Sequence, residues 1–152
     1  MTSSTAPTSS PAFPSCLRIA IVGAESTGKT TLARELATAL AASPVATPIH
    51  RAGPRRVALV GEVLREWCAT AGRTPRPDEQ RDILLEQHRR IEAAAATHDI
   101  VVSDTTALMT HVYSDLLFDD RSLLALAVQR HRDMAATLLT ALEDRKSTRL
   151  NS

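Results

Sequence analysis

Long apolar runs are missing from this sequence of 152 residues. No run approaches the ~20 residues that cross a bilayer, and the start MTSSTAPTSSPAFPS has neither the basic nor the apolar part of a secretion signal. The net charge is only +1, so no strong field would recruit nucleic acid or an anionic membrane. We therefore expect a cytoplasmic protein without a membrane or nucleic-acid partner, whose anion sites are local.

Cysteine and lysine are also scarce. Cys16 and Cys68 lack the paired spacing of a zinc or redox motif, so we expect two reduced thiols without a function. Histidines likewise show no metal-ligand spacing. Lysine occurs only at Lys29 and Lys146, in a chain that otherwise uses arginine as its basic residue. The lysine at position 29 therefore needs a reason.

Composition divides the chain into three parts. Residues 1–16 are Ser, Thr, Pro and Ala with few branched apolar side chains, which predicts a disordered leader. Residues 17–144 have the length and apolar content of one domain. Residues 145–152, RKSTRLNS, contain the only asparagine and break the composition. We expect this last segment to be a non-native tail.

Apolar runs and helical patterns alternate within residues 17–144. The runs at 17–22, 57–60 and 99–104 predict buried strands, and the 3.6-residue pattern predicts helices over 29–42, 61–72, 76–98, 105–117 and 120–133. Residues 134–142 fit either a fourth strand or the end of a helix. This alternation predicts an α/β fold in three layers, with a parallel sheet covered by helices on both faces.

The segment GAESTGKT, residues 23–30, matches the pattern G-x-x-x-x-G-K-[ST] between a predicted strand and a predicted helix. Such a loop turns its N–H groups inward around phosphate oxygens, at the positive end of the helix. Lys29 would reach the β- and γ-phosphates, and the Thr30 hydroxyl would ligate Mg²⁺. A compact ammonium fits inside the loop better than a planar guanidinium, which explains the lysine. We therefore expect ATP and Mg²⁺ as cofactors, held by Gly23, Glu25, Ser26, Thr27, Gly28, Lys29, Thr30 and Thr31.

Asp104 ends the third predicted strand. In a doubly wound sheet the ends of strands 1 and 3 adjoin, so Asp104 would reach the Mg²⁺ water shell beside Thr30. The alternative is a surface aspartate that caps the next helix. Thr105 follows, where ATPases that activate water commonly carry a glutamate, and the GTPase motifs N-K-x-D and D-x-x-G are absent. This favours phosphoryl transfer to a bound hydroxyl of a small molecule.

An acceptor hydroxyl needs a base or a positioning group near the γ-phosphate. Glu62, just beyond the second strand, is the first candidate, and Arg65 lies at the same helix start. Both could instead be ordinary surface charges of a helix N-terminus. Four further residues could line an acceptor pocket, although packing or solvation is the simpler role for each: Gln87, His88, Tyr113 and Asp115.

Four segments together resemble a known family: IVGAESTGKTTLARELA, GEVLREW, LLEQHRRIE and VVSDTTALMTHVYSD. They are similar to the ribosylnicotinamide kinase domain of the bacterial NAD-biosynthesis regulator and to the NadR-like P-loop ATPase/kinase proteins around it. The resemblance covers residues 17 to about 143. It implies transfer of the ATP γ-phosphate to the ribose 5′-hydroxyl of nicotinamide riboside, which gives nicotinamide mononucleotide.

By this resemblance Glu62 and Arg65 match the acceptor-side pair and Asp104 matches the Walker B acid. Thr106 stands where the family often has a second aspartate, and we expect the last strand and the lid arginine of such kinases to be missing. Two alternatives remain: a regulatory P-loop module that binds or hydrolyses ATP without a kinase substrate, and a kinase of another nucleoside or cofactor precursor. The sequence predicts no oligomeric state.

Overall fold

A computed structural model describes residues 16–43 and 54–141, and its central feature is a parallel sheet. The strands follow the order β2-β3-β1-β4. The run at 134–142 therefore contains a strand, and the predicted parallel α/β sheet is confirmed. The strand bounds are β1 Leu17–Gly23, β2 Val57–Val60, β3 Ile100–Asp104 and β4 Ala136–Thr140.

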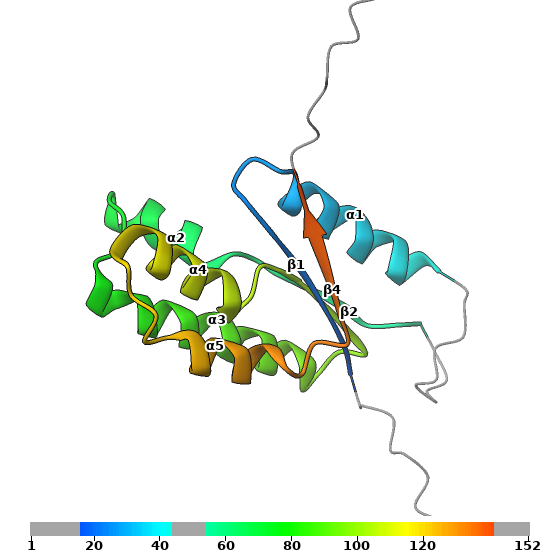
Figure 1. Ribbon diagram of the computed structural model, residues 1–152. Coiled ribbons are helices and arrows are strands. Elements are labelled where there is room, and N and C mark those ends of the chain that lie inside the picture. The colour runs from blue at the N-terminus through cyan, green and yellow to red at the C-terminus, as the bar shows by residue number, and fades with distance from the viewer. Residues whose placement is uncertain (1–15, 44–53, 142–152) are drawn as a thin grey trace, which may run out of the picture.

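Helices lie on both sides of this sheet, as predicted. Figure 1 shows α1 on one side and the remaining helices gathered on the other, so that the sheet is the middle of three layers. The predicted helix over 76–98 is divided into a short 3₁₀ turn and α3, with Pro77 in the first turn, where its missing N–H costs nothing. The helix bounds are α1 Lys29–Ala42, α2 Val63–Ala71, η1 Pro77–Glu79, α3 Gln80–Ala95, α4 Ala107–Phe118 and α5 Leu124–His131.

Alternate side chains of β3 enter two different apolar clusters. Ile100 and Val102 pack with residues of α1, whereas Val101 packs with Ile91 of α3. Cys16, at the end of the predicted leader, is buried in the second cluster. The rest of the leader, most of the loop after α1 and the predicted tail lie outside the described residues.

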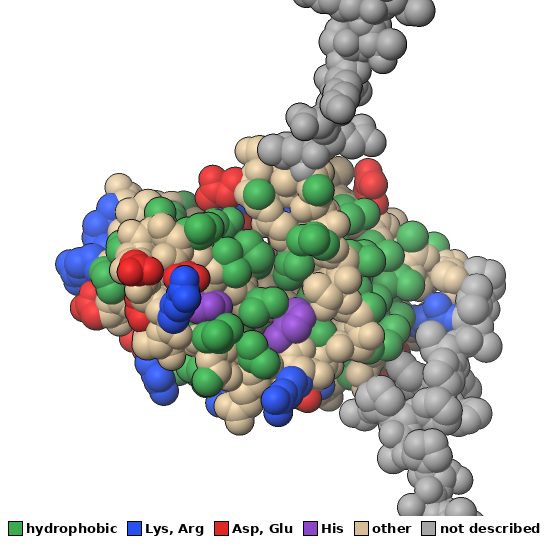
Figure 2. All heavy atoms as spheres, in the orientation of Figure 1, with side chains coloured by type: hydrophobic (Ala, Val, Ile, Leu, Met, Phe, Trp, Pro, Cys, Tyr) green, Lys and Arg blue, Asp and Glu red, His purple; other side chains and the backbone are tan. Residues whose placement is uncertain are grey.

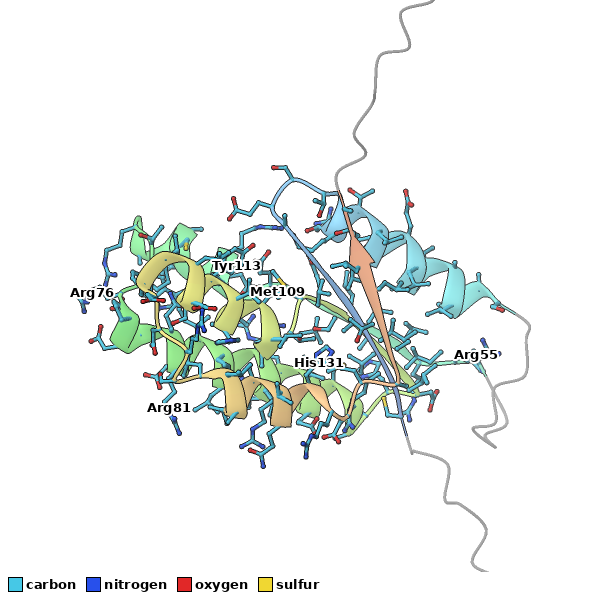
Figure 3. All side chains as sticks on the ribbon, viewed as in Figure 1. Arg55, Arg76, Arg81, Met109, Tyr113 and His131 are labelled. Carbon is cyan, nitrogen blue, oxygen red and sulfur yellow. The ribbon has the colours of Figure 1, made fainter. Side chains whose placement is uncertain are left out.

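The β4 strand is held by hydrogen bonds more than by burial. It pairs with β1 through the register from Ile19↔Ala136 to Gly23↔Thr140, yet Leu139 is 77% exposed. His131, which Figure 3 labels where α5 ends beside β4, bridges Thr137 of the strand and Thr106, with 3.0 Å from each ring nitrogen to a hydroxyl. Figure 2 shows hydrophobic side chains across this face, over β4 and α5.

Within the described residues, no helix is long and apolar enough to cross a bilayer.

Candidate active site

The carboxyl ends of β1 and β3 lie side by side at one edge of the sheet. These two strands pair in parallel, with Ile21 opposite Asp104, so the aspartate reaches the level at which β1 enters the loop of residues 24–28. The sequence-based expectation that these two strand ends adjoin is confirmed. In open α/β sheets this edge is where ligands bind.

The loop between β1 and α1 has the backbone of a phosphate cradle. Gly23 and Gly28 have φ angles of 148° and 82°, which favour glycine, and Ser26 also has a positive φ of 58°. Gly28 is the N-cap of α1, and the first turn of that helix contains no acidic side chain. The positive end of the α1 dipole is therefore available to an anion in the loop.

Side chains of the loop make contacts with the loop itself. Lys29 is only 4% exposed, and its Nζ donates to the Ala24 carbonyl at 2.6 Å. Thr27 Oγ1 donates to the same carbonyl and lies 2.7 Å from Thr140 Oγ1 of β4. The ammonium is therefore already held over the cradle. The remaining predicted nucleotide-binding residues, Glu25, Ser26 and Thr31, are exposed.

Thr30 and Asp104 form the predicted metal side. Thr30 Oγ1 donates to Asp104 Oδ2 at 2.5 Å, and Asp104 is 2% exposed. Its second oxygen, Oδ1, is buried without a hydrogen-bond partner among the described residues. A hydroxyl and a carboxylate with an unused oxygen fit Mg²⁺, which keeps several waters and needs few protein ligands. The alternative role as a helix cap is wrong, because Thr106 is the N-cap of α4 and accepts from Leu108 N.

Thr105 lies in a strained backbone conformation directly after this aspartate. Its φ is 80°, which a β-branched residue rarely adopts, and its N–H donates to the Ile21 carbonyl at 2.9 Å. The Thr105 hydroxyl is buried and has no partner in the described part of the chain. The position that carries a glutamate in water-activating ATPases therefore presents only a hydroxyl here.

Glu62 and Arg65 form an ion pair at the start of α2. Arg65 Nη2 lies 2.7 Å from Glu62 Oε2, and the glutamate side chain is only 8% exposed. Burial raises the pKa of Glu62, while Arg65 acts in the opposite direction. Arg65 Nη1 also donates to Thr30 Oγ1 at 2.8 Å. Although Glu62 is the N-cap of α2, its side chain makes no cap hydrogen bond, so it has no ordinary capping role.

A cavity of about 340 Å³ adjoins the loop and this ion pair, within the size range of small-molecule pockets. Figure 3 shows Tyr113 on α4, on the side of the helical layer nearest the loop after β1. The wall combines apolar side chains with a few polar ones. It is formed by Glu25, Ser26, Glu62, Leu64, Arg65, Cys68, Thr74, Pro75, Gln80, Tyr113 and Leu117.

Only Tyr113 of the four other pocket candidates is in this wall. Gln87 has a structural role instead: its Oε1 accepts from Val63 N at 2.8 Å, and its Nε2 donates to the Gly61 carbonyl at 3.1 Å. Asp115 binds Arg121 Nε at 3.0 Å, and His88 does not line the cavity. Sequence reasoning missed Gln80, although the repeat of glutamine after seven residues on one helix was visible.

The fold, the loop and the strand order define a P-loop NTPase-type domain. The AAA domain family matches residues 18–148, which is most of the chain, and the chain therefore belongs to this family. Membership indicates nucleotide binding, with hydrolysis or phosphoryl transfer as the chemistry. A comparison with curated proteins gave no match.

Proposed function

We propose that the chain is an ATP-dependent small-molecule kinase that transfers the γ-phosphate to a hydroxyl of a riboside, with nicotinamide riboside as the first candidate. One observation carries this proposal. A buried carboxylate with a raised pKa, Glu62, lies in the wall of a cavity that also includes Glu25 and Ser26 of the phosphate loop. A general base works best when its pKa lies near the working pH.

Each predicted site residue has a separable task in this mechanism. Lys29 and the loop amides hold the β- and γ-phosphates. Thr30 and Asp104 would hold Mg²⁺, which neutralises charge on the phosphates when bound. Glu62 accepts the proton of the acceptor hydroxyl while that oxygen bonds to the γ-phosphorus and the bond from phosphorus to the bridging β–γ oxygen breaks. Arg65 orients Glu62 through the ion pair.

The residue after Asp104 supports a bound acceptor in preference to water. Thr105 has no carboxylate with which to activate water. The carboxylate of Glu62, whose pKa is raised, instead lines a cavity that is large enough for a small molecule. The riboside itself is supported by the resemblance of the segments around Glu62 and Asp104 to ribosylnicotinamide kinases.

A coupled ATP-consumption assay tests the proposal. With Mg²⁺ and a panel containing nicotinamide riboside, inosine, adenosine and uridine, we expect ADP formation that depends on one riboside and a product heavier by one phosphate. ATP hydrolysis that no riboside changes would contradict the kinase and favour a regulatory ATPase module. Turnover with a different member of the panel would keep the kinase and replace the substrate.

A further inference from the structure

Two glutamines on one face of α3 have opposite surroundings. Gln80 and Gln87 are both fully buried. Gln87 uses both ends of its amide on Val63 N, the Gly61 carbonyl and Ser103 Oγ. Gln80 uses neither, because its Nε2 and Oε1 have no partner among the described residues. A buried amide without hydrogen bonds is strongly unfavourable, so a function is the expected reason for it.

The position of Gln80 connects it with the cavity. Ile91, farther along α3, packs with Val60 of β2 and Val101 of β3. The helix α3 therefore begins beyond the carboxyl ends of these two strands and then crosses them. Gln87 is anchored at those ends, and Gln80 lies two turns, about 10 Å, beyond it. Gln80 is part of the cavity wall, whereas Glu62 stands beside Gly61 at the level of Gln87. This rise along α3 is comparable to the distance from the hydroxymethyl group of a riboside to the far edge of its base.

We infer that Gln80 selects acceptors whose base carries an amide edge, either an exocyclic carboxamide or a ring lactam. This inference rests on the proposed function. A carboxamide presents an N–H donor beside a C=O acceptor, and only a group with the reverse pair satisfies both. Both amide atoms are covered by neighbouring atoms, so the Gln80 side chain has to rotate into the cavity when the base binds. Oε1 then accepts the N–H of the base, and Nε2 donates to its carbonyl.

The rest of the wall agrees with a planar base that carries no carboxylate. Tyr113 and Leu117 of α4 provide apolar surface on which a ring can pack. Arg65 is the one cationic side chain in the described wall, and it is already engaged with Glu62 and Thr30. No cation is therefore left in this wall to pair with a carboxylate on the base. The amide, and not the acid, is the expected form of the substrate.

Matched riboside pairs test this selection. Nicotinamide riboside is compared with nicotinic acid riboside, and inosine with purine riboside, because each pair differs mainly at the amide edge. In the wild type we expect the amide member of at least one pair to have a KM about tenfold lower than its partner, as two hydrogen bonds allow. Gln80→Leu should remove this discrimination by raising the KM of the amide member about tenfold, so that it approaches the KM of its partner.

The inference and the kinase can fail separately. Direct titration of the same ribosides, with a non-hydrolysable ATP analogue and Mg²⁺ present, measures discrimination without turnover. Discrimination that Gln80→Leu removes, without phosphorylation, would keep the inference and reject the kinase. Phosphorylation with equal KM for both members of each pair, or equal loss of both in Gln80→Leu, would overturn the inference and keep the kinase. Neither binding nor turnover with any riboside would reject both.

Thermal unfolding distinguishes a role of Gln80 in ligand recognition from a role in stabilising the fold. Gln80→Leu should unfold at or above the wild-type temperature, because it removes a buried amide that makes no hydrogen bond to any described residue. The matched variant Gln87→Leu should unfold at a lower temperature, because it removes hydrogen bonds to the backbone at the end of β2. If Gln80→Leu is destabilised as much as Gln87→Leu, the Gln80 amide has a structural partner and the inference is wrong.

Discussion

The candidate site has two halves. The phosphate half consists of the loop at 23–28 with Lys29, Thr30 and Asp104, and the acceptor half is the cavity wall with Glu62 and Gln80. They differ in how many of their polar groups find hydrogen-bond partners within the chain. In the phosphate half, Lys29 and Thr30 have hydrogen-bond partners, whereas Asp104 Oδ1 and the hydroxyl of the next residue have none among the described residues. In the acceptor half, Glu62 is buried with a raised pKa, and Gln80 is buried without a hydrogen-bond partner in the described part of the chain. The phosphate half is therefore a preformed cradle, whereas the acceptor half carries unfavourable burial that its ligand would relieve. A lower free energy of unfolding is common in proteins whose site needs specific polar groups.

The largest effect should come from breaking the phosphate half. Lys29→Ala removes two or more charge-assisted hydrogen bonds to phosphate, each worth about 1.5–3 kcal/mol, so we expect transfer to fall more than about 100-fold. The fold should remain, as circular dichroism would show. Arg34→Ala, an exposed substitution on the same helix, is the control and should retain full activity. Turnover that survives in Lys29→Ala would reject the site.

Glu62→Gln breaks the acceptor half and should leave the phosphate half intact. We expect kcat to fall about 100-fold, which is the usual contribution of a general base, with little change in the Kd of ATP. Chemical denaturation should show equal or higher stability, because an ionised carboxylate no longer has to be buried. Equal losses of ATP binding and of kcat would contradict an acceptor-side role.

Asp104→Asn tests whether Asp104, in the phosphate half, contributes to Mg²⁺ binding. An amide oxygen can still accept from Thr30 Oγ1, so the fold should be kept, but the negative charge toward Mg²⁺ is lost. We expect the Mg²⁺ concentration needed for tight binding of an ATP analogue to rise about tenfold, a loss typical of weakened metal surroundings. Binding measured without Mg²⁺ is the control and should change little. A variant with unaltered Mg²⁺ dependence would remove Asp104 from the metal site.

The smallest effect concerns pH. Glu62 must be ionised to accept a proton, and burial raises its pKa, so kcat should rise with pH along a limb above the range of ordinary glutamates. Because Arg65 lowers the pKa of Glu62, Arg65→Gln should move this limb to higher pH. The displacement should be small and should shrink further in high salt, since the Arg65 side chain is 56% exposed. A limb that persists unchanged in Glu62→Gln would belong to another group.

Much of the phosphate half could be predicted because its determinants are local. The pattern from Gly23 to Thr30 specifies a loop between a strand and a helix. The proximity of Asp104 follows from a general rule for parallel sheets. The strand at β4 could not be distinguished from a helix end, because a short apolar run satisfies both periodicities. Pairing with the free edge of β1 decides it in the fold.

The acceptor half was less predictable because its properties arise from tertiary contacts. Gln80 and Gln87 have the same side chain and the same helical face, yet only the second meets the ends of two strands. No local pattern reports that difference. The positive φ of Thr105 was equally hidden, since nothing in the run VVSDTT favours a left-handed residue.

Gly23 shows how the outer strand depends on the loop. A methyl group at this position would collide with the side chain and the carbonyl of Thr140, at the last residue of β4. The first glycine of the motif is thus required by the neighbouring strand, apart from its proposed role in holding phosphate. Alanine at this position would push β4 away from β1 at the edge of the sheet. The exchange would therefore lower the stability of the fold even in the absence of any nucleotide.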